Sequence, residues 1–222
     1  MRFFRMLLAG MALCIWLLPG CDRKEPIVPE SEKPVFAGTI LAIGDSLTEG
    51  YGLEEADAYP ALLQQRLLAE GYRYKVINAG IGGETTSGLR SRIDWAITLS
   101  PDIVIIETGA NDALRAIDTA LIKGNMEAVI LILKERNIPV VLAGMRIYKN
   151  LGADYASAFE NIYPDLAGVH GLIFMPFFLK DVAGNPGLNQ QDGMHPTAEG
   201  YRIISNNIYP YVVEAINRLK KK

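Results

Sequence analysis

One serine occupies a position where a nucleophile would be useful, at the end of an apolar run and inside a glycine-bearing turn. Ser46 follows the β-rich segment 39–43 and lies in the sequence Gly-Asp-Ser-Leu at positions 44–47. A serine beyond a buried strand would lie near backbone N–H groups that can stabilise an oxyanion. The alternative is that Asp45 and Ser46 only cap a turn or a helix, a common role for these residue types. Ser46 is therefore a candidate nucleophile for acyl transfer.

A serine nucleophile needs a general base, and the sequence offers only two histidines, His170 and His195. His195 follows Asp192 by three residues, in the sequence Asp-Gly-Met-His-Pro, so the carboxylate could orient and stabilise its imidazole. His170, in Gly-Val-His-Gly, has no such neighbour in the sequence, and we interpret it as an ordinary loop histidine. These residue types predict a Ser–His–Asp site of the kind that hydrolyses esters through an acyl-serine.

Four sequence blocks together resemble the GDSL, or SGNH, hydrolase family. They occur in the family's order within roughly residues 37–215, and they are Gly44-Asp45-Ser46-Leu47, Asn78-Ala79-Gly80-Ile81-Gly82-Gly83, Gly109-Ala110-Asn111-Asp112 and Asp192-Gly193-Met194-His195. The resemblance implies that Ser46 attacks, that His195 is general base and acid, and that Asp192 orients His195. It also implies an oxyanion hole formed by the backbone N–H groups of Ser46 and Gly83 and the side-chain amide of Asn111.

Within this family, the chain is most similar to the bacterial periplasmic arylesterase, thioesterase and lysophospholipase branch. That likeness implies a serine esterase for small carboxylic esters, acyl thioesters or lysophospholipids, with no metal and no organic cofactor. The segment 112–117, directly after Asn111, carries apolar side chains that could contact the acyl chain. One departure is Gly-Gly-Glu-Thr at positions 82–85, where the branch commonly has Ser-Gly-Asp-Thr, but Gly83 itself is kept.

Other functions are open on the same residues. An O-acetyl esterase acting on envelope polysaccharide would use the same catalytic residues. A non-catalytic lipid- or glycan-binding lipoprotein, or one that only tethers, would have no need of Ser46, Asn111 and His195 together. Glu49 and Glu84 could suggest glycoside hydrolysis, but nothing in the sequence determines their separation. Isolated histidines without ligand spacing do not predict a metal site.

The elements that must position these residues alternate between strand and helix patterns. Short β-rich runs predict strands at 39–43, 74–77, 101–108, 140–143 and 172–174. Apolar residues at helical spacing predict helices over 59–71, 86–99, 122–133, 155–166 and 197–219. Such alternation predicts a parallel α/β sheet with helices on both faces. The resemblance implies a flavodoxin-like three-layer α/β/α sandwich.

In such a sheet, ligands bind at the carboxyl ends of the strands. Ser46, Gly83 and Asn111 each follow a predicted strand, with Asn111 in the loop beyond it, whereas Asp192 and His195 lie in the loop before the last helix. We therefore expect these five residues to meet at one edge of the sheet.

The beginning of the chain has a different composition. A basic start and an apolar run from Met6 to Leu18 are typical of a secretory signal, and Leu18-Pro19-Gly20-Cys21 resembles a bacterial lipoprotein cleavage box. These features predict a signal peptide over 1–20, a lipidated Cys21 with a flexible tether over 21–36, and a hydrolase domain over 37–222. Simple secretion and an uncleaved anchor are the alternatives. The expected location is the periplasmic side of a bacterial membrane, inner or outer.

Composition limits the partners. A formal net charge of −3 and one short basic run, Lys220-Lys221-Lys222, argue against nucleic acid as a partner. Cys14 lies in the predicted leader, so the mature chain would keep only Cys21 and form no internal disulfide. The expected partners are an ester or lipid-like substrate and the membrane that holds the anchor, and no obligate protein partner is evident.

Overall fold

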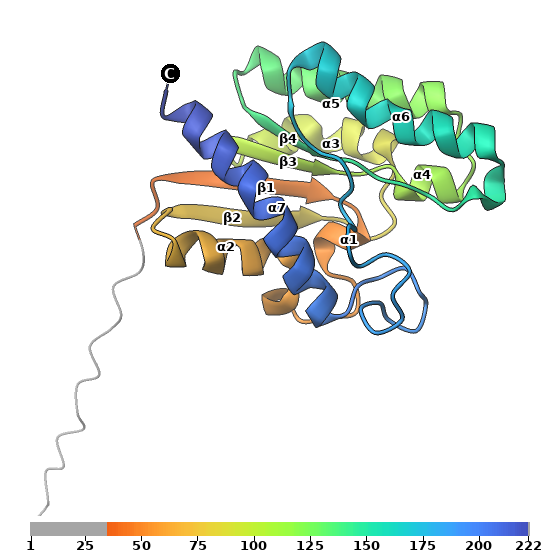
Figure 1. The fold of residues 1–222 in the computed structure, drawn as a ribbon. Helices are drawn as coiled ribbons and strands as arrows, with labels where there is room; N and C mark the ends of the chain where they lie inside the picture. Colours follow the sequence, from red (N-terminus) through yellow and green to blue (C-terminus); the bar gives the residue numbers. More distant parts are fainter. Residues whose placement is uncertain (1–34, 222) are drawn as a thin grey trace, which may run out of the picture. The chain divides into compact units, whose positions relative to one another are not determined.

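A computed structural model describes residues 35–221 of the chain (Figure 1). The predicted signal peptide, the candidate lipidation site Cys21 and almost all of the tether lie outside the described residues. The described chain contains one five-stranded sheet in which all strands are parallel, in the order β2-β1-β3-β4-β5. Its strands are β1 (Gly38–Gly44), β2 (Tyr74–Gly80), β3 (Ile103–Glu107), β4 (Val140–Ala143) and β5 (Ile173–Met175). This strand order is that of flavodoxin-like sheets.

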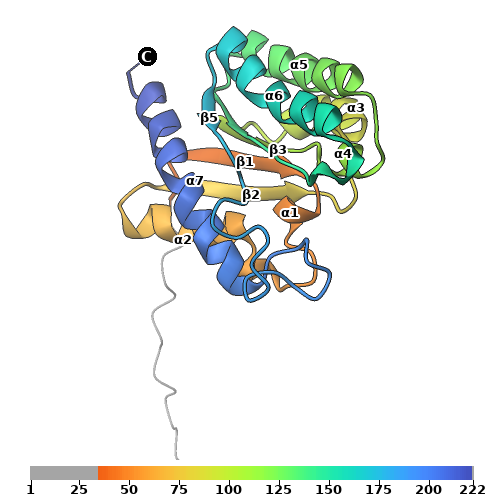
Figure 2. The ribbon, with the colours of Figure 1, turned by 45° about the vertical axis from the view of Figure 1, so that its right-hand side comes forward.

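Helices cover both faces of the sheet. On one face lie α2 (Tyr59–Ala69) and α7 (Ala198–Leu219), and on the other lie α3 (Thr86–Ile97), α5 (Thr119–Glu135) and α6 (Ala153–His170) (Figures 1 and 2). Short helices α1 (Ser46–Glu49) and α4 (Ala110–Leu114) follow β1 and β3, and two 3-10 turns, η1 (Glu55–Asp57) and η2 (Lys149–Leu151), lie in loops. The predicted three-layer α/β/α sandwich is confirmed.

The central strands are apolar over most of their length because both of their faces are covered. The segment Ile40–Ile43 of β1 is fully buried, and it pairs in register with Ile103–Ile106 of β3. In α5 the buried side chains recur at helical spacing, as the sequence predicts: Ile122, Met126, Val129, Ile130 and Leu133. The alternating strand and helix patterns therefore reflect one continuous core on the two sides of the sheet.

Local sequence signals explain where the helices begin. Thr85 caps α3 by accepting a hydrogen bond from the N–H of Gly88, and Thr197 caps α7 through the N–H of Gly200.

The loop assignment of His170 is wrong, because this residue ends α6 and Gly171 follows it in the left-handed conformation. No helix among residues 35–221 combines the length and the apolar character that crossing a membrane requires.

Candidate active site

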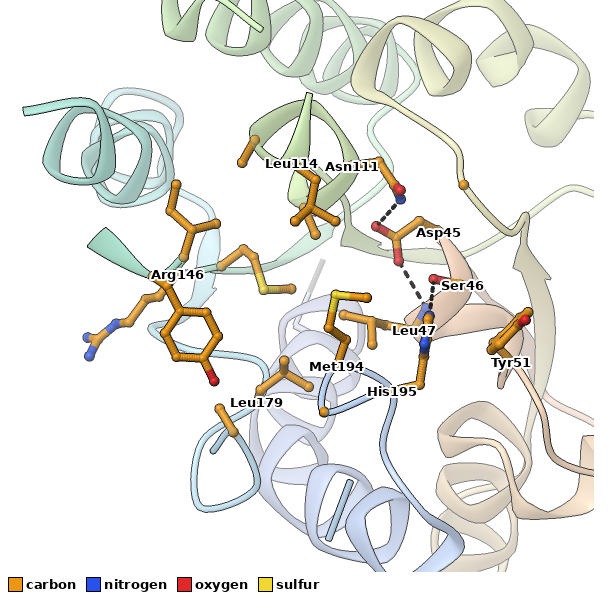
Figure 3. Close-up of a pocket in the computed structure, with 18 of the residues that line it drawn as sticks. Asp45, Ser46, Leu47, Tyr51, Asn111, Leu114, Arg146, Leu179, Met194 and His195 are labelled. Atoms are coloured by element: carbon orange, nitrogen blue, oxygen red, sulfur yellow. Dashed lines mark hydrogen bonds between the residues drawn. The ribbon is translucent and has the colours of Figure 1, made fainter. Parts of the chain in front are cut away.

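Ser46 begins a single helical turn at the carboxyl end of β1. Asp45 caps this turn, because its Oδ1 accepts a hydrogen bond from the N–H of Leu47 at 2.9 Å. The capping interpretation is therefore confirmed for Asp45. It does not compete with a chemical role for Ser46, whose side chain faces a pocket (Figure 3).

The loop before α7 brings His195 and Asp192 to Ser46. Nε2 of His195 lies 2.9 Å from Oγ of Ser46, and Nδ1 of His195 lies 2.6 Å from Oδ2 of Asp192. Oδ1 of Asp192 accepts hydrogen bonds from the N–H groups of Met194 and His195 at 2.9 and 3.0 Å. The hydrogen bond with the imidazole, followed by these two backbone bonds, lowers the pKa of Asp192 to about 2. The carboxylate is therefore ionised near neutral pH and can stabilise an imidazolium.

Hydrogen bonds of Gln190 hold this loop in place, although no sequence motif indicated this residue. Its backbone N–H donates to the carbonyl of His195 at 2.7 Å. Its side-chain Nε2 donates to the carbonyls of Tyr51 and Pro196 at 2.8 and 3.0 Å. The segment after Ser46 and the segment that carries His195 are thus joined by one amide side chain.

Asn111 lies in the first turn of α4, so its prediction as a loop residue is wrong in detail. Gly109 precedes this helix with φ of 107°, a conformation that glycine adopts without strain, and it turns the chain directly from β3 into α4. Nδ2 of Asn111 donates to Oδ2 of Asp45 at 3.1 Å. Asn111 therefore lines the same pocket as Ser46, at the carboxyl edge of the sheet.

Gly83 lies in the loop after β2 and also lines the pocket. Its φ is 75°, and its carbonyl accepts a hydrogen bond at 3.1 Å from Nη2 of Arg115, which follows α4. Neither the N–H of Gly83 nor that of Ser46 donates a hydrogen bond to another residue within 35–221. Both backbone donors are therefore available to a ligand, and Arg115 is a further residue that the motifs did not reveal.

The carboxylates considered for glycoside hydrolysis do not line the pocket. Glu84 forms a double hydrogen bond with Arg92, at 2.6 and 2.7 Å, and Arg92 also donates to the carbonyl of Ala79 at 2.9 Å. This ion pair ties the end of β2 to α3 and shapes the loop that presents Gly83. Glu84 thus supports the loop in which the sequence departs from its branch.

His170 is engaged elsewhere, against α5. Its Nε2 lies 3.0 Å from Oε1 of Glu127, and Lys134 donates to its carbonyl at 3.0 Å. His170 does have a carboxylate partner, but this partner is 43 positions away in the sequence, so local spacing could not reveal it. The residue does not line the pocket.

The pocket in front of Ser46 has a volume of about 540 Å³. Most of its walls are apolar, and Figure 3 shows Leu114, Leu179 and Met194 around the space that Ser46 and His195 face. The apolar side chains that line it are Leu47, Ala110, Ala113, Leu114, Met145, Ile147, Leu151, Phe177, Leu179, Ala183 and Met194. Of the segment 112–117, Ala113 and Leu114 line the pocket, whereas Asp112 is buried and accepts hydrogen bonds from Thr86.

Two buried carboxyl groups lie directly behind the site. Asp45 is 1% exposed and Glu107, the last residue of β3, is 0% exposed. Burial raises the pKa of Asp45 to about 6 and raises the pKa of Glu107 well above its ordinary value, with the nearby Asp45 charge as a second cause for Glu107. Glu107 was not among the residues that the sequence indicated.

Within the described chain, no group of three or more His, Cys, Asp or Glu residues could hold a metal ion.

The parallel sheet and the Ser–His–Asp arrangement at its carboxyl edge define the class of SGNH-type hydrolases. Within this class, the chain belongs to the GDSL-like lipase/acylhydrolase family, whose sequence pattern matches residues 42–203. The crystal structure of TesA has a TM-score of 0.77 and 34% identity, and the match covers 80% of this chain and 99% of that one. The SGNH-hydrolase family esterase AlinE4 has a TM-score of 0.68 and 40% identity, and the match covers 80% of this chain and 96% of that one.

Curated relatives agree with this assignment. Esterase TesA of Pseudomonas aeruginosa is 35% identical over 78% of this chain and 87% of its own length. An arylesterase of Vibrio mimicus is 37% identical, over 79% and 88%. Thioesterase 1/protease 1/lysophospholipase L1 of Escherichia coli is 32% identical, over 77% and 81%. The predicted family is confirmed, and the protein is an ester hydrolase.

Proposed function

We propose that this hydrolase cleaves carboxylic esters with apolar acyl groups through an acyl-enzyme intermediate on Ser46. The observation that carries the proposal is the hydrogen-bonded chain from Ser46 Oγ to His195 and on to Asp192, at 2.9 and 2.6 Å, facing an apolar pocket. A hydroxyl, an imidazole and a carboxylate in this order form the unit that activates serine for acyl transfer.

In the acylation step, Oγ of Ser46 attacks the ester carbonyl while Nε2 of His195 takes the hydroxyl proton. Oδ2 of Asp192 accepts a hydrogen bond from the Nδ1–H group of His195, and the negative charge of Asp192 stabilises the imidazolium. His195 then protonates the leaving alkoxide, phenolate or thiolate, which departs and leaves the acyl group on Ser46. In deacylation, His195 takes a proton from a water that attacks the acyl-serine carbonyl. His195 then gives this proton to Oγ of Ser46 as the bond to the acyl group breaks, which releases the acid and restores the serine.

The negative charge on the carbonyl oxygen needs donors that are in place before the reaction. We assign this role to the N–H groups of Ser46 and Gly83 and to Nδ2 of Asn111. The support is that both backbone donors are unused within the described chain and that Asn111 borders the same pocket. Donors fixed beforehand stabilise a developing oxyanion more than they stabilise a neutral carbonyl.

The substrate class follows from the pocket. A space of about 540 Å³ with mostly apolar walls can bury an acyl chain of several carbons, and each buried methylene contributes about 0.8 kcal/mol. The proposed substrates are therefore small aryl or alkyl esters, acyl thioesters or lysophospholipids. An O-acetyl esterase for envelope polysaccharide would use the same triad, but an acetyl group would leave most of this pocket unfilled.

The test compares p-nitrophenyl esters with acetyl, butyryl and octanoyl groups. Ser46→Ala should abolish turnover of all three, and the wild type should prefer the longer chains in kcat/KM. Leu114→Asp, at a pocket residue that is 63% exposed, should weaken turnover of the octanoyl ester much more than that of the acetyl ester. Leu131→Asp is the matched control, because Leu131 is 45% exposed on α5 and does not line the pocket. Preference for the acetyl ester would favour the O-acetyl esterase alternative.

We further propose that the mature enzyme begins at a lipidated Cys21 and is held at the periplasmic side of a bacterial membrane by the segment 21–36. The support is the sequence Leu18-Pro19-Gly20-Cys21 after a basic start and an apolar run. Cys21→Ser removes the thiol that would carry the lipid, so the variant should lose its anchor while keeping esterase activity. Mass spectrometry of the native protein without an acyl modification on Cys21 would contradict this proposal.

A further inference from the structure

Two buried carboxyl groups, Asp45 and Glu107, lie behind Ser46. Asp45 and Glu107 lie within hydrogen-bonding reach of each other, and no arginine or lysine of the described chain pairs with either. Two adjacent carboxylates cannot both be ionised at this depth without a large cost, because burial and mutual repulsion both oppose it. The pair must therefore hold a proton at neutral pH.

The contacts of Glu107 indicate which carboxyl carries that proton. Its Oε2 accepts a hydrogen bond from Oγ1 of Thr48 at 2.9 Å, whereas its Oε1 has no donor among the described residues. Asp45 receives two hydrogen bonds, from the N–H of Leu47 and from Nδ2 of Asn111. Both oxygens of Asp45 accept hydrogen bonds and Asp45 lines the pocket, whereas Glu107 is fully buried with one oxygen unpaired. The ionised form is therefore better stabilised on Asp45, so the proton belongs on Glu107.

Gly44 leaves the space that Glu107 needs beside the turn of Ser46. A Cβ on Gly44, the last residue of β1, would collide with Oγ1 of Thr48 and with the backbone and carboxyl oxygens of Glu107. Glycine at position 44 thus lets the end of β3 approach the turn that carries Ser46. The first residue of the Gly-Asp-Ser-Leu sequence serves the carboxyl pair as well as the turn.

We propose that Glu107 is protonated and donates a hydrogen bond to Asp45, and that it is thereby a positioning residue for ester hydrolysis, because this bond would keep Asp45 an acceptor that holds the Asn111 amide. This inference rests on the proposed function and assigns a role within the same site. Nδ2 of Asn111 carries two N–H donors, of which one binds Asp45, so the second is left for the oxyanion.

The orientation of the Asn111 amide is the quantity that the pair controls. An amide rotated by half a turn would place its carbonyl oxygen against the Asp45 carboxylate, and two acceptors repel. The same rotation would remove the N–H donor from the oxyanion. Because Glu107 keeps its proton, it adds no second negative charge behind the oxyanion and draws part of the charge of Asp45 away from it.

The test replaces Glu107 in two ways. Glu107→Gln keeps the size, an acceptor for Thr48 and a permanent N–H donor for Asp45, so kcat should stay within about 3-fold of the wild type. Glu107→Leu removes the donor, and kcat should fall about 10- to 100-fold with little change in KM, since a transition-state contact is weakened. Thr108→Val is the matched control, because this buried hydroxyl has no partner among the described residues and its loss should leave kcat unchanged.

A double mutant separates positioning from general damage. In an Asn111→Ala background, Glu107→Leu should change kcat by less than about 3-fold, since Glu107 acts through the missing amide. Additive losses, an unchanged kcat in Glu107→Leu, or equal losses in Glu107→Gln and Glu107→Leu would each overturn the proposal. If Glu107→Leu does not fold, Asp45→Asn gives the same test, and wild-type kcat in that variant would overturn it. Turnover that survives in Ser46→Ala would instead contradict the proposed function itself.

Discussion

The ring of Tyr51 packs against the imidazole of His195, with 4.5 Å between the ring centroids and an interplanar angle of 37°. Tyr51 is 53% exposed, and Gln190 holds its backbone carbonyl while also bonding the loop of His195. Hydrogen bonds of the imidazole with Ser46 and Asp192 lie in the plane of the ring, whereas Tyr51 contacts its face. Tyr51 therefore limits tilting of His195, which the in-plane hydrogen bonds restrain less.

We predict that Tyr51→Ala lowers kcat/KM about 2- to 10-fold, because an aromatic pair contributes about 0.5–1.5 kcal/mol. Tyr51→Phe keeps the ring and should retain wild-type activity. Steady-state kinetics on a short p-nitrophenyl ester measures both variants. Equal losses in the two variants would show that the hydroxyl, and not the ring contact, matters.

The two histidines should respond very differently to replacement. His195→Ala removes the base that contacts Ser46 at 2.9 Å and should abolish nearly all esterase activity. His170→Ala breaks a contact with Glu127 far from the pocket and should leave most of the activity, with at most a small loss of thermal stability. A folded His195→Ala protein with near-normal turnover would contradict the assignment.

Loss of the Asn111 side chain should affect the chemical step. We expect Asn111→Ala to lower kcat about 10²–10³-fold with much less change in KM, as for the loss of one oxyanion donor. Thermal unfolding should change little, since this side chain makes one hydrogen bond, to Asp45, and is partly exposed. Activity that falls only in proportion to the folded fraction would require withdrawal of the oxyanion role.

Asp192 should contribute acid-sensitive stability. Its pKa is about 2 in the folded protein and 3.8 ordinarily, so its contribution is present above about pH 4 and is lost as pH falls through 2. Asp192→Asn should therefore be less stable than the wild type at neutral pH, with a difference that shrinks toward pH 2. The side chain is 34% exposed, so the difference should not exceed about 1 kcal/mol. Thermal melts across this range measure it, and a constant difference would contradict the prediction.

Glu107 should make the stability of the fold depend on pH in the opposite direction. Its folded-state pKa is raised, so folding takes up a proton at neutral pH, and this cost grows as pH rises above the ordinary value of 4.5. Glu107→Gln removes the cost, and its Tm should exceed that of the wild type by more at pH 8 than at pH 5. The titratable groups that face Glu107 are Asp45, Tyr59, Tyr163 and Tyr201, and burial keeps the three tyrosines neutral. Parallel Tm curves for the two proteins would show that Glu107 is already ionised.

The sequence alone determined the elements and the residue types of the site. Strand and helix patterns are local, so the five strands and the long helices could be predicted with small errors at their ends. Asp192 and His195 could be paired for the same reason, because a separation of three residues keeps both side chains within one loop. Short segments such as α1 and α4 were missed, since each is a single turn that depends on its surroundings.

Only the tertiary structure decided which distant residues meet. Ser46 and His195 are 149 positions apart, and they touch because a strand end and the loop before α7 reach the same edge of the sheet. The register of β1 against β3, with Ile43 beside Ile106, brings Glu107 to Thr48 and Asp45, 59 and more positions away. The side chains of Arg115 and Gln190 donate hydrogen bonds to backbone carbonyls, which every residue carries. Such contacts leave no residue pattern in the sequence, because their specificity comes from the position of the backbone and not from the type of the partner.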